Sequence, residues 1–362
     1  MFMPGMRQIF SMAFLAALLV AAGVPAADYP RPAHDDFVSR DFRFAGGETL
    51  PELRLHYFTL GTPAKDATGR IINAVLLLHG TGGSGAGFLN DAFAGELFGA
   101  GQPLDATRWF VIAPDSIGHG KSSKPSDGLR AKFPKYGYVD MVEAQRRLLV
   151  DGLGVEHLRL ILGTSMGGMH AWLWAGKHPD FTDAVFPVAC LPAQVSGRNR
   201  MERRLIVDAI RNDPQWNDGN YAKQPQGLVT AVRMIAISAG SVKQFYRQAP
   251  TQEATDRLFD RMVEQRMKNA DANDLLYAWD ASRDYDPAPE LGKIRAKVLA
   301  VNFEDDERNP PELGILEREF ARLPQGRFVL IPASERTRGH ASLGDAALWK
   351  DYVIELLTRS ER

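Results

Sequence analysis

Residues 160–170, which read LILGTSMGGMH, constrain the fold of this chain more than any other stretch. They place Ser165 between Gly163 and Gly167, directly after an apolar run. A G-x-S-x-G pattern in this setting is typical of a sharp strand-to-helix turn that lifts a serine hydroxyl to the edge of a sheet. Glycine leaves room for the strained backbone, and Gly168 lets the next helix approach the strand closely. Because a chain with 33 glycines can produce this pattern by chance, the pattern indicates such a turn only if the surrounding sequence agrees.

Apolar runs with strand character recur along the chain, and helical patterns such as that of residues 138–152 separate them. Alternation of strands and helices is typical of a mostly parallel sheet that helices cover on both faces. The sequence therefore predicts an α/β fold. A polar N-terminal stretch precedes the predicted strands, which are residues 74–78, 109–113, 158–162, 184–189, 297–303 and 327–331.

The alternation stops after residue 190 and resumes only at about residue 287. In between, helical patterns at residues 199–212, 227–238 and 251–269 follow one another without a strand. Since α/β sheets bind ligands outside the carboxyl ends of their strands, helices inserted there would cover the site. We therefore expect a core of residues 28–190 and 287–362 and a helical cap of residues 191–286, packed into one compact body.

The first 27 residues differ from the rest of the chain. Arg7 is their only charged residue, residues 9–24 are almost wholly apolar, and small residues precede Asp28. These features predict a secretory signal peptide at residues 1–27 and a periplasmic or secreted protein without a stable membrane anchor. The alternative, a transmembrane anchor, needs an apolar run of about 20 residues. A single cysteine, Cys190, excludes an intramolecular disulfide and is expected to be a small buried residue.

A serine hydroxyl becomes a nucleophile only when a base removes its proton and a carboxylate orients that base. When the serine lies at such a turn, the acid and then the histidine follow it along the chain. His340 is the only histidine after residue 178, and it lies beyond the last predicted strand. His340 is therefore the predicted base for Ser165.

The acid is expected just after the predicted strand at residues 297–303, where four carboxylates follow one another at positions 304–307. Asp306 is favoured because related loops place a proline four residues after the acid, and Pro310 fits this spacing. Asp305 is the alternative. The remaining carboxylates of the four are expected to lie in a solvent-exposed acidic turn.

The glycine-rich loop at residues 78–83 is predicted to bind the oxyanion of an acyl intermediate. It follows the strand at residues 74–78 and can bring the backbone N–H of Thr81 opposite that of Met166, the residue after the nucleophile. The loop lacks the pattern of a phosphate-binding loop, and His79 is expected to be structural. Neither a metal-ligand cluster nor a cofactor motif is present in the sequence.

With these residues in place, the chain resembles the α/β-hydrolase superfamily and, more closely, its homoserine O-acetyltransferase family. The resemblance covers about two-thirds of the chain after residue 27, and its cap motifs are more specific than the serine turn. It includes DMVEAQ at residues 140–145, GTSMGGM at 163–169, DPQW at 213–216, GNY at 219–221, residues 303–310 and GH at 339–340.

Departures from the acetyltransferases bear on the substrate. The resemblance implies an aspartate after the catalytic histidine that suits the amino group of homoserine, and Ala341 stands there. Arg233 matches the family's cap arginine and is the expected ligand of a substrate carboxylate, whereas the tyrosine expected seven residues later is Gly240. Because a buried amine without a counter-ion is costly, these departures disfavour free homoserine.

Formal net charge is −1, from 43 basic and 44 acidic residues, so no nucleic-acid partner is expected. The expected partner is a small acyl substrate, and a homodimer is compatible with the sequence. We expect an exported serine hydrolase that acts on a small ester, because a secreted acetyltransferase would lack acetyl-CoA. The alternatives are a homoserine O-acetyltransferase-like acyltransferase with the same triad and a catalytically silent binding protein, against which the complete triad argues.

Overall fold

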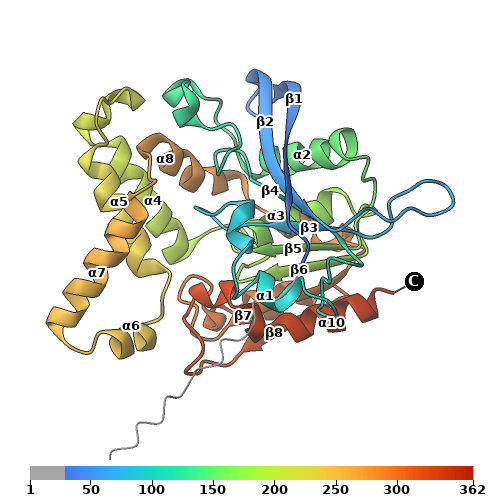
Figure 1. Cartoon of the computed structure of the whole chain (residues 1–362). Coiled ribbons are helices and arrows are strands. Elements are labelled where there is room, and N and C mark those ends of the chain that lie inside the picture. The colour runs from blue at the N-terminus through green and yellow to red at the C-terminus, as the bar shows by residue number, and fades with distance from the viewer. Residues whose placement is uncertain (1–28, 362) are drawn as a thin grey trace, which may run out of the picture.

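A central sheet of eight strands organises the described part of the chain, residues 29–361 of a computed structural model (Figure 1). The strand order is β1-β2-β4-β3-β5-β6-β7-β8, with β1 and β2 antiparallel to their neighbours and β3 to β8 parallel. The strands are β1 Ala33–Arg43, β2 Thr49–Leu60, β3 Ala74–Leu78, β4 Phe110–Pro114, β5 Leu160–Thr164, β6 Ala184–Val188, β7 Lys297–Phe303 and β8 Gly326–Ile331.

The predicted α/β fold is confirmed, and all six predicted strands are present as β3 to β8. The hairpin of β1 and β2 was not predicted, because polar residues dominate this N-terminal region. β1 is an edge strand whose side chains are mostly exposed, so it lacks an apolar run. In β2, buried Leu53, Leu55 and Tyr57 alternate with more exposed residues, and this period of two is the signal that could have revealed the strand.

Alternate residues of the central strands enter two separate cores. In β3, Leu76 and Leu78 belong to the core under α2 and α3, whereas Val75 and Leu77 belong to the core under α1 and α10. Helices therefore cover both faces of the sheet, as buried parallel strands require. These helices are α1 Ala94–Leu97, α2 Tyr138–Arg147, α3 Met166–Lys177, α9 Ile315–Phe320 and α10 Lys350–Arg359.

Five helices follow one another between β6 and β7, in the segment predicted as the cap. They lie together beside the carboxyl ends of the parallel strands (Figure 1). Ile206, Val232 and Trp279 from these helices share one apolar cluster with Trp172 of α3, so cap and core are packed together. The helices are α4 Gly197–Arg211, α5 Gln226–Ser238, α6 Val242–Gln248, α7 Gln252–Met267 and α8 Ala272–Asp280.

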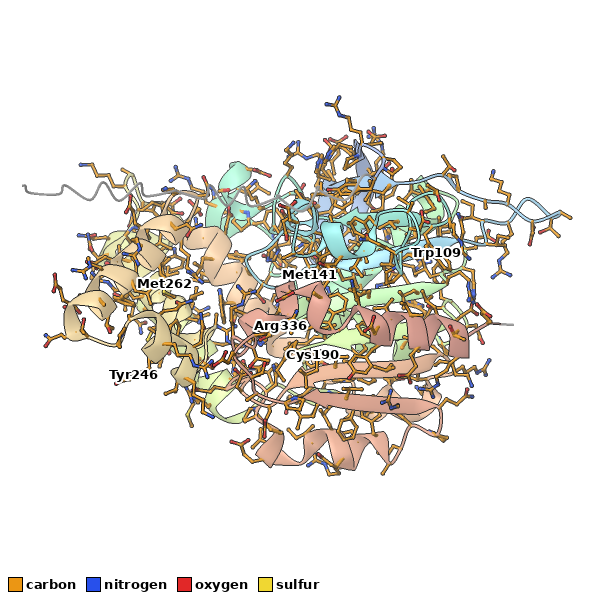
Figure 2. The ribbon with its side chains drawn as sticks, turned by 60° about the horizontal axis from the view of Figure 1, so that its bottom comes forward. Trp109, Met141, Cys190, Tyr246, Met262 and Arg336 are labelled. Carbon is orange, nitrogen blue, oxygen red and sulfur yellow. The ribbon has the colours of Figure 1, made fainter. Side chains whose placement is uncertain are left out.

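The view in Figure 2 separates the two ends of the molecule. Tyr246 and Met262 lie on the cap at one end, Trp109 lies near the other end, and Cys190 lies between them. Cys190 is buried, and a Cβ atom on Gly168 would lie 2.6 Å from its Sγ, so this cysteine packs against α3. The predicted signal peptide lies outside the described residues. Within residues 29–361, no helix is both long and apolar enough to cross a membrane.

Candidate active site

The turn between β5 and α3 holds Ser165 in a backbone conformation that side-chain-bearing residues rarely adopt, with φ of 52° and ψ of −113°. Two glycines make the turn possible. A Cβ atom on Gly163 would lie 2.1 Å from the carbonyl oxygen of Gly167, and one on Gly167 would lie 1.9 Å from that of Leu78. Strain at such a position is typical of functional residues, and here it places the serine at the carboxyl edge of the sheet.

Ser165, His340 and Asp306 form a hydrogen-bonded chain. The Ser165 Oγ lies 2.9 Å from Nε2 of His340, and the Nδ1 of His340 lies 2.8 Å from Oδ2 of Asp306. Because a carboxylate faces Nδ1, that nitrogen carries the proton and Nε2 accepts the hydrogen bond from the serine hydroxyl. All three side chains are buried. This is the arrangement in which an imidazole can remove the serine proton.

Asp306 is held ionised by its surroundings. Burial raises its pKa, but His340 and the hydrogen bonds from Asn309 and Arg308 outweigh burial, so the pKa lies below its ordinary value. Asn309 Nδ2 donates to Oδ2 at 2.9 Å, and the Arg308 backbone N–H donates to Oδ1 at 2.9 Å. The alternative acid, Asp305, instead accepts from the Gly339 backbone N–H at 3.0 Å. The structure thus brings Asp306, not Asp305, to the histidine.

The segment that carries His340 is tied to the cap. The backbone N–H of Ala341 donates to the carbonyl oxygen of Ala239 at 2.9 Å. Gly339 has φ of +59°, and a Cβ atom there would lie 2.8 Å from the backbone nitrogen of Ser241. A Cβ atom on Gly240 would likewise lie 2.4 Å from the Phe245 ring, which explains why no tyrosine fits at position 240.

The predicted oxyanion loop lies beside Ser165. A Cβ atom on Gly80 would lie 3.4 Å from the Ser165 Cβ, and Thr81 lines the same cavity as Ser165. Neither the Thr81 N–H nor the Met166 N–H donates to an acceptor within residues 29–361. Free N–H groups beside a serine nucleophile are the donors that an oxyanion needs.

His79 holds this loop in place. Its ring lies between the Gly80 carbonyl oxygen, 2.9 Å from Nδ1, and the Ser116 backbone N–H, which donates to Nε2 at 3.0 Å. Only the neutral tautomer with a proton on Nδ1 satisfies both contacts. Burial lowers the pKa of His79 to about 4, which agrees with a neutral ring.

The neutral state of His79 predicts a loss of stability in acid. As the pH falls from 6.5 to 4, the unfolded chain binds a proton at this histidine and the folded chain does not, so the free energy of unfolding should drop by about 3 kcal/mol from this residue. Replacing His79 with asparagine should reduce that dependence in urea unfolding measured from pH 4 to 8. The same change at exposed His34 is the control, and an unaltered pH dependence in His79→Asn would contradict the assignment.

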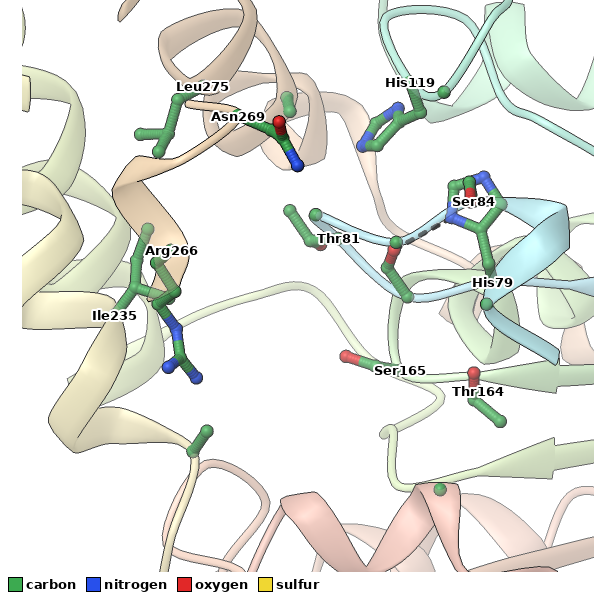
Figure 3. A pocket seen from close by; sticks show the side chains of 18 of the residues that line it. His79, Thr81, Ser84, His119, Thr164, Ser165, Ile235, Arg266, Asn269 and Leu275 are labelled. Carbon is green, nitrogen blue, oxygen red and sulfur yellow. Dashed lines mark hydrogen bonds between the residues drawn. The ribbon is translucent and has the colours of Figure 1, made fainter. Parts of the chain in front are cut away.

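A cavity of about 900 Å³ lies over Ser165 between the core and the cap. The oxyanion loop and His119 form one side, and the cap helices form the other with Ile235, Arg266 and Trp279. Figure 3 shows Ile235 and Arg266 across the opening from Thr81 and Ser165. The volume is within the range of small-molecule sites.

The cavity lining differs from the prediction at its charged positions. Arg233 lies on α5, but its side chain is exposed and is not part of the lining, so the structure does not bring it to Ser165. Arg266 and Arg308 do line the cavity and were missed. Ala341, which follows His340, also lines it and provides no carboxylate there.

Comparisons with known proteins agree with this architecture. A family model described as the alpha/beta hydrolase fold matches residues 73–337. A homoserine O-acetyltransferase of Geobacter sulfurreducens is 30% identical over an alignment of 366 residues, which covers 89% of this chain and 96% of that protein.

Two solved structures have the same fold. The homoserine O-acetyltransferase from Bacillus anthracis has a TM-score of 0.79 at 21% identity, over 91% of this chain and 98% of that one. An acetylester hydrolase from Corynebacterium glutamicum has a TM-score of 0.75 at 21% identity, over 90% and 96%. The chain therefore belongs to the α/β-hydrolase superfamily, close to its homoserine O-acetyltransferase family.

Proposed function

We propose that this chain is an exported serine hydrolase that cleaves a small ester through a covalent acyl-enzyme. The observation that carries the proposal is the hydrogen-bonded chain from Ser165 through His340 to Asp306, whose serine lines a cavity between the core and the cap. Export rests on the composition of residues 1–27, which has the features of a signal peptide.

In the first half of the reaction, the Ser165 oxygen forms a bond to the ester carbonyl carbon while His340 takes the serine proton. The carbonyl electrons move to the oxygen, which the Thr81 and Met166 N–H groups stabilise. The C–O bond to the alcohol then breaks, and the alcohol leaves with the proton from His340. Asp306 stays ionised and stabilises the imidazolium that forms between these steps.

Water completes the cycle. His340 removes a proton from a water molecule, the water oxygen bonds to the acyl carbon, and Ser165 leaves with the proton as the free acid is released. Two features favour water over homoserine as acceptor. Ala341 provides no counter-ion for an amino group, and an exported enzyme would not meet acetyl-CoA.

Acyl transfer to an alcohol is the second candidate function, and the names of the relatives favour it. The curated relative described above bears the name homoserine O-acetyltransferase, and an acyltransferase would use the same acyl-enzyme with an alcohol in place of water. Both activities share the first half-reaction, so only the fate of the acyl group separates them.

The decisive experiment measures p-nitrophenol release from p-nitrophenyl acetate by the purified 28–362 chain, with and without added alcohols including homoserine. We expect turnover in water alone at a rate that homoserine does not change, and acetate as the product. Turnover that requires an alcohol, with accumulation of its acetyl ester, would instead establish the acyltransferase.

A further inference from the structure

Two arginines face the cavity over the nucleophile, although neither holds the position that the family resemblance implied. Arg308 lies in the loop after β7 and Arg266 lies on α7 of the cap, and both line the cavity with Ser165. Figure 3 shows Arg266 on the cap side, across the opening from Thr81. Two guanidinium groups therefore line the cavity that holds Ser165, and that of Arg266 lies across it from the oxyanion loop.

The Arg308 side chain is fixed in place. Its Nε donates to the Ser238 carbonyl oxygen at 2.9 Å, its Nη2 donates to the Ser238 hydroxyl, and its guanidinium carbon lies 5.2 Å from the centre of the Trp279 ring. Its backbone N–H also donates to Asp306. The guanidinium is thus held at a set place relative to the triad, with Nη1 left over from these contacts.

Neither cavity arginine forms an ion pair within residues 29–361. The two acids that line the same cavity have other partners: Asp271 accepts from Tyr221 and Gln224, and Asp274 accepts from Ser126. Asp306 pairs with His340, and both Glu202 and Glu307 pair with Arg198. Within the described part of the chain, the Arg266 guanidinium makes only one hydrogen bond, of 3.4 Å, to the backbone carbonyl oxygen of Met262. Two arginines that line one cavity without an ion-pair partner can bind an anion there.

A third arginine adds to the positive charge. Arg203 is buried, contacts the same Trp279 ring at 5.2 Å, and donates to the neutral side chains of Asn199 and Tyr138. Burial and the charge of Arg203 lower the pKa of Arg308 to about 10, so Arg308 remains charged at neutral pH. Burial and Arg203 therefore disfavour the positive charge on Arg308, and a bound anion would stabilise that charge.

We propose that the substrate of this site carries a carboxylate, which binds the guanidinium groups of Arg308 and Arg266 while the ester carbonyl lies at Ser165. This inference rests on the proposed ester hydrolysis and names its substrate class. The carboxylate belongs either to the acyl part, as in the monoester of a dicarboxylic acid, or to the alcohol part, as in the ester of a hydroxy acid.

The test compares kcat/KM for charged and neutral esters of similar size. For the acyl part, the pair is mono-p-nitrophenyl succinate and p-nitrophenyl butyrate. For the alcohol part, the pair is acetoxyacetate and acetoxyacetamide, whose cleavage is measured as released acetate. We expect one charged ester to exceed its neutral partner by at least about 30-fold, the range for a buried charge pair. Equal values within both pairs would overturn the proposal.

Arg308→Gln and Arg266→Gln test the residues themselves. Each should lower the ratio of kcat/KM for the preferred charged ester to kcat/KM for its neutral partner by at least about 30-fold. The matched control is Arg233→Gln, since Arg233 is an exposed cap arginine outside the cavity lining. A variant that lowers both esters equally would point to a damaged fold, and if both arginine variants did so the charge assignment would fail.

A binding measurement separates this inference from the proposed function. Calorimetric titration of Ser165→Ala with glutarate and with glutaramide requires no catalysis. We expect glutarate to bind and glutaramide not to, with the difference lost in Arg308→Gln on the same background. Absence of ester turnover together with selective glutarate binding would reject the hydrolase and keep the anion site, whereas serine-dependent turnover without selective binding would do the reverse.

Discussion

Replacing Ser165 with alanine should abolish ester cleavage and leave the fold intact. Loss of a triad serine removes the acyl-enzyme route altogether, and losses of about 10⁶-fold in kcat are known for such enzymes. The Ser165 Oγ contacts only His340 among the side chains of the described residues, so its removal leaves no other buried group without a partner. The measurement is p-nitrophenol release, with circular dichroism and the thermal midpoint as evidence of folding.

The same variant should also fail to react with a fluorophosphonate probe that labels active serines. Both results are needed, because a slow rate alone does not identify the nucleophile. Ester turnover within tenfold of the parent chain in a folded Ser165→Ala protein would remove Ser165 from the mechanism.

Asp306→Asn should lower kcat by about 10⁴-fold, equivalent to about 5.5 kcal/mol of transition-state stabilisation. An amide NH₂ group in place of the Oδ2 atom would donate toward Nδ1 of His340 and favour the tautomer that cannot accept the serine proton. The free energy of unfolding is expected to change by less than this, since the amide oxygen in place of Oδ1 still accepts from the Arg308 backbone N–H.

Asp305→Asn is the matched control for Asp306→Asn. Its side chain accepts from the Gly339 N–H and not from the histidine, and an asparagine oxygen can accept the same hydrogen bond. We expect kcat within about tenfold of the parent chain. If Asp305→Asn were the more damaging of the two changes, the acid assignment would move to Asp305.

Much of the architecture could be predicted from the sequence, because buried parallel strands are continuous apolar runs and the serine turn needs glycines at set positions. A Cβ atom on Gly163 or Gly167 would lie only 2.1 or 1.9 Å from a backbone carbonyl oxygen, so only glycine fits at these two positions. The pairing of β1 with β2 was missed because an exposed edge strand has no such run.

The cavity charges could not be predicted in the same way. Arg266 lies on α7, where a charged side chain normally indicates a solvated helix face. Arg308 directly follows the four carboxylates at positions 304–307, among which the sequence predicts the catalytic acid. Which side of α5 faces the cavity depends on how the cap packs, and that packing turns Arg233 outward. Contacts between residues far apart in the sequence, such as the hydrogen bond from Arg308 to Ser238, leave no local pattern in the sequence.

The hydrogen bond from Ala341 to Ala239 has a consequence for how such an enzyme could be altered. Because the histidine segment and the cap share this bond and the tight contact at Gly339, a hinged opening of the cap would carry the base away from the serine. We therefore expect substrate to enter and leave through the mouth of the cavity while the cap stays in place. For the same reason, a foreign cap grafted to change the specificity would also have to restore the contacts that position His340. In this chain the cap contributes both to the cavity and to the placement of the histidine.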